Sequence, residues 1–110
     1  MNKISINNIF SYNKNDLTQE NEFFENLLKE KSFKIERIIS NGQQTAPNIW
    51  LEESTNEFVL LLEGNSKLKF YADNDLYNLN KGDWLIIPKN TKHRVEFTDK
   101  LTFWLTVHYE

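Results

Sequence analysis

Apolar and polar positions alternate from residue 33 onward, and this pattern predicts a series of short β-strands. Phe33 and Ile35 alternate with Lys34 and Glu36, and the run ends at the turn-forming residues 40–42. Successive side chains of a strand point to opposite faces, so a period of two is typical of a strand with one buried face. We expect further strands at 48–53, 57–63, 67–72, 83–88, 93–98 and 101–109, separated by turns rich in Gly, Asn, Asp and Lys.

The N-terminal part of the chain carries a different pattern. Residues 1–14 mix isoleucines with Asn and Ser, and we expect a short edge strand or an ordered tail there. Further on, Phe23 and Leu27, and likewise Phe24 and Leu28, are four residues apart. That spacing places them on one face of a helix, so it predicts a single helix within residues 16–31.

This order of elements predicts an all-β fold. The connections between the expected strands are too short for the crossover helices that a parallel sheet needs. Many short strands with little helix are typical of a β-sandwich or a closed barrel. A chain of 110 residues suffices for one domain. We expect a strand and helix extension at 1–32 and a barrel at 33–110, forming a single domain overall.

Composition narrows the possible partners. The net charge of −3 provides no clustered basic surface for nucleic acid. The absence of Cys excludes disulfides, thiol nucleophiles and Cys-based zinc sites. The N-terminus lacks the apolar core of a signal peptide, and the apolar run 58–62 is too short to span a bilayer. We expect a cytoplasmic protein without nucleic-acid or membrane partners.

The segment from Gly82 to His93 has turn residues at regular places. Gly82 permits a positive φ before a strand, and Pro88 ends that strand where no backbone donor is needed. Asn90 tolerates a left-handed conformation, and His93 then opens the next strand. This spacing resembles the second conserved motif of the cupin family, with Asn90 in place of the usual Gly and Phe97 where the family often has Asn.

The first cupin motif has two His and a Glu, followed seven residues later by a Gly. Glu57 and Gly64 match the Glu-to-Gly spacing, but the two His are missing. Their positions correspond to Trp50 and Glu52 in one register, and to residues 51 and 53 in a register one residue later. The resemblance covers about residues 33–109. It implies a cupin-type double-stranded β-helix, a jelly-roll barrel, of the kind found in small single-domain bacterial cupins of unassigned function.

The resemblance implies a pocket inside the barrel, for which the sequence allows three functions. His93 and Glu57, with Glu52 and His108 as further candidates, could hold a divalent ion such as Fe, Mn, Ni or Zn. Without a metal, His93 as base and Glu57 or Glu52 as acid could isomerise, epimerise or decarboxylate a small polar metabolite. The same pocket could bind a small molecule without reaction. The expected pocket residues are Trp50, Glu52, Glu57, His93, Phe97, Trp104 and His108.

The strand at 57–63 is apolar on both faces. If Glu57 points into the barrel, Phe58, Leu60 and Leu62 lie on the other face. Such a face is covered either by the N-terminal helix or by another subunit. We expect a homodimer, and a purely structural dimeric barrel without catalysis is the third interpretation of the chain.

Overall fold

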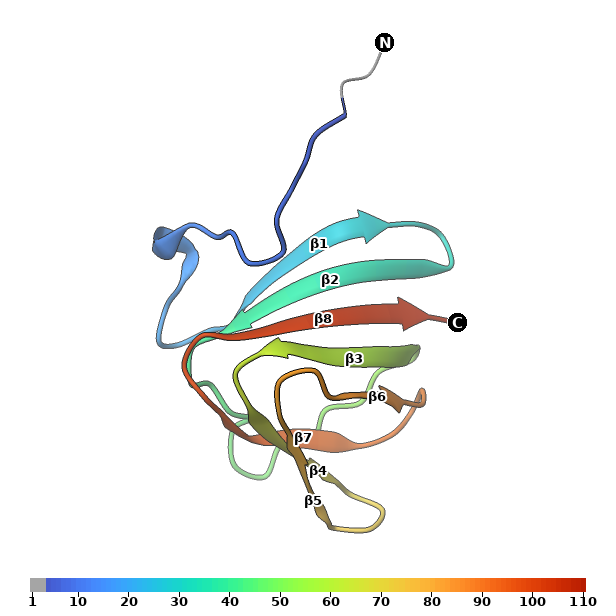
Figure 1. Cartoon of the computed structure of the whole chain (residues 1–110). Coiled ribbons are helices and arrows are strands. Elements are labelled where there is room, and N and C mark those ends of the chain that lie inside the picture. Colours follow the sequence, from blue (N-terminus) through green and yellow to red (C-terminus); the bar gives the residue numbers. More distant parts are fainter. Residues whose placement is uncertain (1–3) are drawn as a thin grey trace.

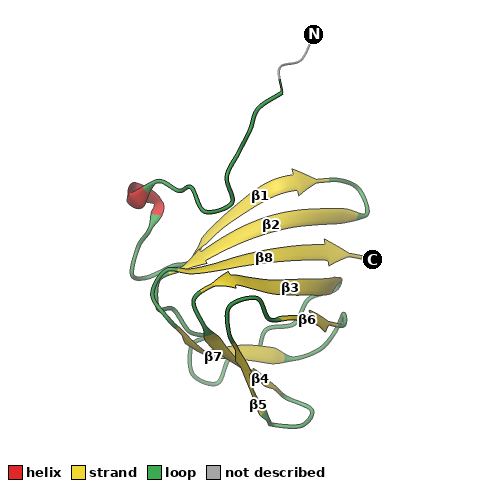
Figure 2. Cartoon of the chain, in the orientation of Figure 1, coloured by secondary structure: helices red, strands yellow, loops and turns green. Residues whose placement is uncertain are grey.

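The computed structural model describes residues 4–110 and consists of two antiparallel sheets (Figures 1 and 2). The larger sheet has the strand order β1-β2-β8-β3-β6 and the smaller has the order β5-β4-β7. The elements of the structure, in chain order, are η1 (Lys14–Asp16), β1 (Phe23–Lys29), β2 (Phe33–Ser40), β3 (Asn56–Glu63), β4 (Ser66–Phe70), β5 (Leu76–Leu79), β6 (Trp84–Ile87), β7 (His93–Thr98) and β8 (Thr102–Tyr109).

The core lies between the two sheets, where inward side chains of both meet. The larger sheet contributes Val59 and Leu61 from β3 and Trp104 from β8. The smaller sheet contributes Leu68 from β4 and Leu79 from β5. The all-β fold expected from the alternating pattern is confirmed, and so is the cupin-type jelly roll that the resemblance implied. In residues 4–110, no helix has the length and apolar character needed to cross a membrane.

The helix predicted within 16–31 is wrong, because residues 23–29 form the edge strand β1. This strand pairs antiparallel with β2, with Phe23 opposite Ile39 and Phe24 opposite Ile38. The pairing shifts register between Asn26 and Leu28. Residues four positions apart also share one face of a strand, because side chains alternate with a period of two. The spacing of Phe23 and Leu27 therefore fits a strand as well as a helix, and it could not distinguish the two.

One predicted strand does not form, and one strand of the structure was not predicted. Within 48–53 only Leu51 makes a β-bridge, with His93, and no strand forms. The strand β5, which pairs with β4, falls in residues 73–82, where turn residues suggested only a connection. Its four residues alternate too briefly to stand out beside the Asp and Asn around them.

Residues 9–12 form no strand and pack on the outer face of the larger sheet, whereas Ile4 and Ile6 before them are almost fully exposed. Phe10 and Tyr12 each pack edge-to-face on Phe103, with ring centroids 5.6 Å apart. The Arg37 guanidinium donates hydrogen bonds to the carbonyl oxygens of Ile9 and Ser11 and pairs with Glu25 at 2.9 Å. Residues 1–3 lie outside the described residues.

The turns that the sequence singled out have the expected backbone. Gly82 has a φ of +89° and Asn90 a φ of +60°. Gly64 has a φ of +94°, and a Cβ placed there would lie 2.9 Å from Thr102 Cα. Glycine at position 64 is therefore required by conformation and by space alike.

Candidate functional site

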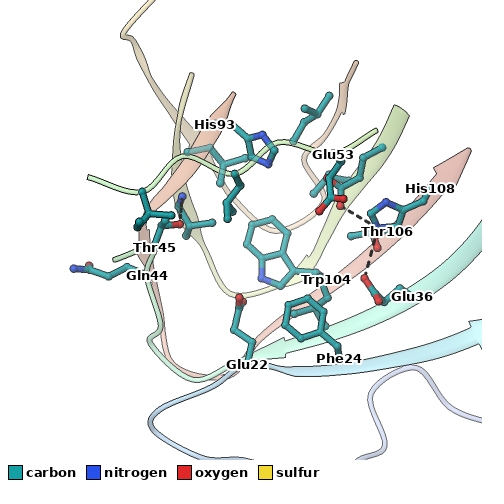
Figure 3. Close-up of a pocket in the computed structure, with 18 of the residues that line it drawn as sticks. Glu22, Phe24, Glu36, Gln44, Thr45, Glu53, His93, Trp104, Thr106 and His108 are labelled. Carbon is teal, nitrogen blue, oxygen red and sulfur yellow. Dashed lines mark hydrogen bonds and ion pairs between the residues drawn. The ribbon is translucent and has the colours of Figure 1, made fainter. Parts of the chain in front are cut away.

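A cavity of about 430 Å³ opens between the two sheets (Figure 3). Strands β2, β3 and β8 form one wall and β4 and β7 the other, with the loop 44–53 at the rim. Its floor and walls are mainly apolar. The polar and titratable residues that line it are Glu22, Glu36, Gln44, Thr45, Glu53, Glu57, His93, Thr106 and His108.

The loop before β3 decides between the two registers of the first motif. Leu51 N donates to His93 O at 2.7 Å and His93 N donates to Leu51 O at 3.0 Å, while Asn90 N donates to Glu53 O at 2.7 Å. Leu51 and Glu53 line the cavity, and Trp50 and Glu52 do not. The register one residue later is therefore the one that the structure adopts.

The two residues of the other register face elsewhere. The Trp50 ring packs edge-to-face on Tyr71 and lies under the Arg94 guanidinium. Glu52 is exposed. Their placement in the pocket was a wrong prediction, because backbone pairing with His93 orients residues 51 and 53 inward.

Phe97 was also predicted to face the pocket, and it lies outside it, 42% exposed. Along β7, His93 and Val95 line the cavity, as strict alternation requires. The pairing with β4 then skips Glu96, since Val95 is opposite Leu68 and Phe97 is opposite Lys67. A bulge of this kind reverses the side-chain direction beyond it.

A buried cluster joins two carboxylates and one imidazole at the β2–β8–β3 side of the cavity. His108 Nε2 lies 3.4 Å from Glu57 Oε2 and 3.6 Å from Glu36 Oε1 (Figure 3). The strand pairing explains the cluster, because β8 lies between β2 and β3 and Glu57 is directly opposite His108. His108 therefore points inward, which settles the orientation that the sequence left open.

Glu57 is the titratable group whose environment changes its chemistry most. Burial, and then the nearby carboxylates of Glu53 and Glu36, raise the pKa of Glu57 from 4.5 to about 7, while Lys34 opposes the shift. Like charges and a low dielectric both disfavour the ionised form. Near neutral pH this carboxyl group can therefore either give or take a proton.

His93 comes from the opposite sheet. Its Nδ1 lies 2.8 Å from Thr91 O. A carbonyl oxygen can only accept a hydrogen bond, so Nδ1 carries the proton and Nε2 of the neutral ring has a free lone pair. The ring lies beside Phe70, with centroids 6.0 Å apart. His93 and Glu57 are thus two proton-active groups on facing walls, whereas the partner in contact with Glu57 is His108.

A second polar group lies at the start of β1. Trp104 Nε1 donates to Ser40 Oγ at 3.2 Å, and Ser40 Oγ in turn donates to Glu22 Oε2. Burial raises the pKa of Glu22, and the hydrogen bond from Ser40 partly offsets that rise. Figure 3 shows Glu22 next to the indole nitrogen of Trp104.

The residues at the positions of the first cupin motif do not fit a metal ion. Leu51 occupies one of the two positions where the cupin motif has His, and its side chain offers no donor. Glu52 lies outside the cavity, so it cannot complete a set with His93 and Glu57. Within residues 4–110, no three side chains of His, Cys, Asp or Glu come together in a way that could hold a metal ion.

Sequence reasoning missed several lining residues. Glu36 stands in a strand that also carries Lys34 and Arg37, so its charge did not single it out, although the pairing of β2 with β8 sets it opposite Thr106. Residue 53 was named only as a His position of the second register. Glu22 was hidden because it fell within the predicted helix, and alternation along β8 places Thr106 on the same face as His108.

Comparisons with known proteins agree with the fold. The crystal structure of a "putative mannose-6-phosphate isomerase" from Ralstonia eutropha JMP134 is 35% identical, covers 97% of this chain and 99% of its own, and has a TM-score of 0.87. A cupin superfamily protein from Desulfitobacterium hafniense DCB-2 is 16% identical over 84% of this chain and 81% of its own, with a TM-score of 0.71. An RmlC-like cupin from Shewanella frigidimarina NCIMB 400 is 13% identical over 78% and 73%, with a TM-score of 0.65.

Neither the family models nor the curated proteins yielded a match.

Proposed function

The chain belongs to the cupin superfamily, and from that premise we propose that its cavity catalyses metal-independent proton transfer on a small polar metabolite. The observation that carries the proposal is the buried carboxyl of Glu57, whose pKa is raised to about 7 on the cavity wall. A group with a pKa near the working pH is the most effective general acid or base.

The second requirement of an isomerase is a separate base. His93 lines the same cavity from β7, and its Nε2 is free to accept a proton. In the proposed reaction Nε2 removes the proton from the carbon next to a carbonyl group. The electron pair of that C–H bond forms a C=C bond while the carbonyl oxygen takes the proton of Glu57. The substrate carries a hydroxyl on the carbon that loses its proton, so the intermediate is an enediol. His93 then returns the proton to the former carbonyl carbon while that other hydroxyl gives its proton to the Glu57 carboxylate and becomes the new carbonyl, so atoms and electrons balance.

The neighbours of Glu57 would tune this exchange. Glu36 and Glu53 oppose a second negative charge, so they favour the protonated acid before the reaction. His108 Nε2, 3.4 Å from Glu57 Oε2, would stabilise the carboxylate formed when the proton is delivered. The name of the Ralstonia protein, an isomerase, describes chemistry of the same class.

Solvent exchange tests the proposal on a whole class of candidate substrates at once. A panel of aldoses and 2-ketoses is incubated with the protein in D₂O, and loss of the proton next to the carbonyl is followed by NMR. We expect exchange with the wild type and a loss of about 100-fold or more in Glu57→Gln and in His93→Gln. Glu52→Gln, which removes an exposed carboxylate outside the cavity, is the matched control. Equal exchange in all four proteins, or none with the wild type, would contradict the proposal.

We also propose that the outer face of the larger sheet binds a second copy of the chain. Trp84 is 60% exposed and Ile86 50% exposed on the edge strand β6, and Phe58 of β3 stacks on Trp84 with centroids 5.3 Å apart. The helix once expected to cover this face does not form. Glu63 and Lys81, which lie beside this apolar patch, form an ion pair at 3.1 Å and so neutralise each other. The patch can therefore meet the same patch of a second copy across a twofold axis.

A further inference from the structure

Carboxylates outnumber the other titratable groups that line the cavity. Four line it, those of Glu22, Glu36, Glu53 and Glu57, beside the two imidazoles of His93 and His108. No Lys or Arg is among the lining residues. An anionic ligand would therefore meet repulsion with no Lys or Arg to offset it, whereas recognition of phosphate ordinarily uses Arg, Lys or backbone N–H groups.

The two arginines of the chain are both committed elsewhere. Arg37 points to the outer face, where it pairs with Glu25 and binds the N-terminal segment. Arg94 pairs with Glu96 at 2.9 Å and donates to the loop carbonyls of Thr45 and Ile49. Neither guanidinium can turn into the cavity without breaking several hydrogen bonds.

An unused polar atom shows that the cavity wall can contact a polar ligand. Thr106 is 2% exposed, lines the cavity, and its Oγ1 has no hydrogen-bond partner among the described residues. A buried polar atom without a partner costs free energy, and a bound ligand would remove that cost.

Glu22 differs from the other three carboxylates in its surroundings. Its Oε2 is held by the Ser40 hydroxyl, which accepts from the Trp104 indole, so the carboxyl group has a fixed orientation. Glu36 and Glu57 share contact with His108, whereas no His, Lys or Arg pairs with Glu22 within residues 4–110.

From these features we infer that the cavity selects a small ligand bearing an ammonium group, which Glu22 binds beside Trp104, and that it excludes phosphorylated ligands. This inference rests on the proposed function only in using the same cavity, and it names the substrate class of that site. It also means that the hexose phosphate in the name of the Ralstonia protein does not carry over to this chain, because the cavity is lined by four carboxylates and by no Lys or Arg.

Three hexoses of one scaffold and different charge provide the test. Mannosamine, mannose and mannose 6-phosphate are titrated into the protein by calorimetry at about pH 6.5, where most of the amine is protonated. We expect mannosamine to bind about tenfold or more tightly than mannose, and mannose 6-phosphate to bind more weakly than mannose. Glu22→Gln should reduce the preference for mannosamine to within about threefold, while Glu20→Gln, an exposed carboxylate two residues away, should leave it unchanged.

Several results would overturn the inference: mannose 6-phosphate binding more tightly than mannosamine, equal affinity for the amine and the neutral sugar, no binding by any of the three, or a preference that survives Glu22→Gln. If that variant does not fold, the ranking of the three sugars by the wild type decides alone. Binding is measured without turnover, so loss of proton exchange in the earlier experiment leaves this test intact.

Discussion

Replacing Glu57 by Gln should change how the stability of the protein depends on pH. The folded chain raises the pKa of this carboxyl from 4.5 to about 7. Below pH 4.5 both the folded and the unfolded states hold the proton, so the full stabilising contribution of the proton is present. Between pH 4.5 and 7 the unfolded chain ionises while the folded chain keeps its proton, so stability falls as pH rises. Above pH 7 this contribution is lost.

The size of the loss follows from the shift. A difference of about 2.5 pKa units corresponds to roughly 3 kcal/mol, because one unit is worth about 1.4 kcal/mol. Gln has the same shape and no charge at any pH. The variant should therefore resemble the wild type near pH 4.5 and exceed it in free energy of unfolding by about 3 kcal/mol at pH 8.

Urea unfolding, followed by tryptophan fluorescence at intervals from pH 4.5 to 8.5, measures this difference directly. The difference between wild type and Glu57→Gln isolates this one ionisation from the other carboxylates. Thermal unfolding should agree, with a shift of about 4–8 °C per kcal/mol for a domain of this size. Glu52→Gln, on the exposed loop, should give a curve parallel to the wild type. Parallel curves for Glu57→Gln too, or a variant less stable than wild type at pH 8, would refute the reasoning.

Three further changes test other parts of the molecule. Gly64→Ala should lower the free energy of unfolding by roughly 2 kcal/mol or more, because the added Cβ would meet Thr102. Gly82→Ala, which has open space around it, should lower the free energy of unfolding by about 1 kcal/mol. Urea unfolding compares the two variants, and equal losses would contradict the steric argument. Trp84→Glu should convert a dimer into a monomer in sedimentation velocity, and a wild type that is monomeric at high concentration would reject the interface. Elemental analysis of untagged protein should find less than about 0.1 Fe, Mn, Ni or Zn per chain. The double variant Leu51→His, Glu53→His should bind zinc at least about tenfold more tightly than the wild type. A stoichiometric metal in the wild type would contradict the claim that the first-motif residues do not fit a metal ion.

Strand positions were predictable where alternation was regular and a turn residue marked the end. The strands β3, β6, β7 and β8 fall close to their predicted ranges because Gly64, Gly82 and Asn90 have the backbone that the sequence demanded of them. The cupin resemblance then implied a jelly-roll barrel with a pocket inside it. Glu57, His93 and His108 could be assigned to one cavity on that basis.

The errors at β1 and β7 have different physical causes. The four-residue spacing of Phe23 and Leu27 fits one face of a strand as well as one face of a helix, so it did not reveal β1. A register shift at Glu96 turned Phe97 outward. Alternation alone cannot locate an extra residue in a strand, since the bulge depends on the partner strand. Glu22 escaped notice because its place in the cavity depends on the strand that replaced the helix.

An NMR titration of the Glu57 side-chain carboxyl carbon, assigned by comparison with Glu57→Gln, is the most direct test of the central claim that this group holds a proton near neutral pH. The structure predicts a midpoint at about pH 7. A midpoint near the ordinary value of about 4.3 for glutamate would contradict the claim, because such a carboxyl would be fully ionised at neutral pH and unable to deliver a proton.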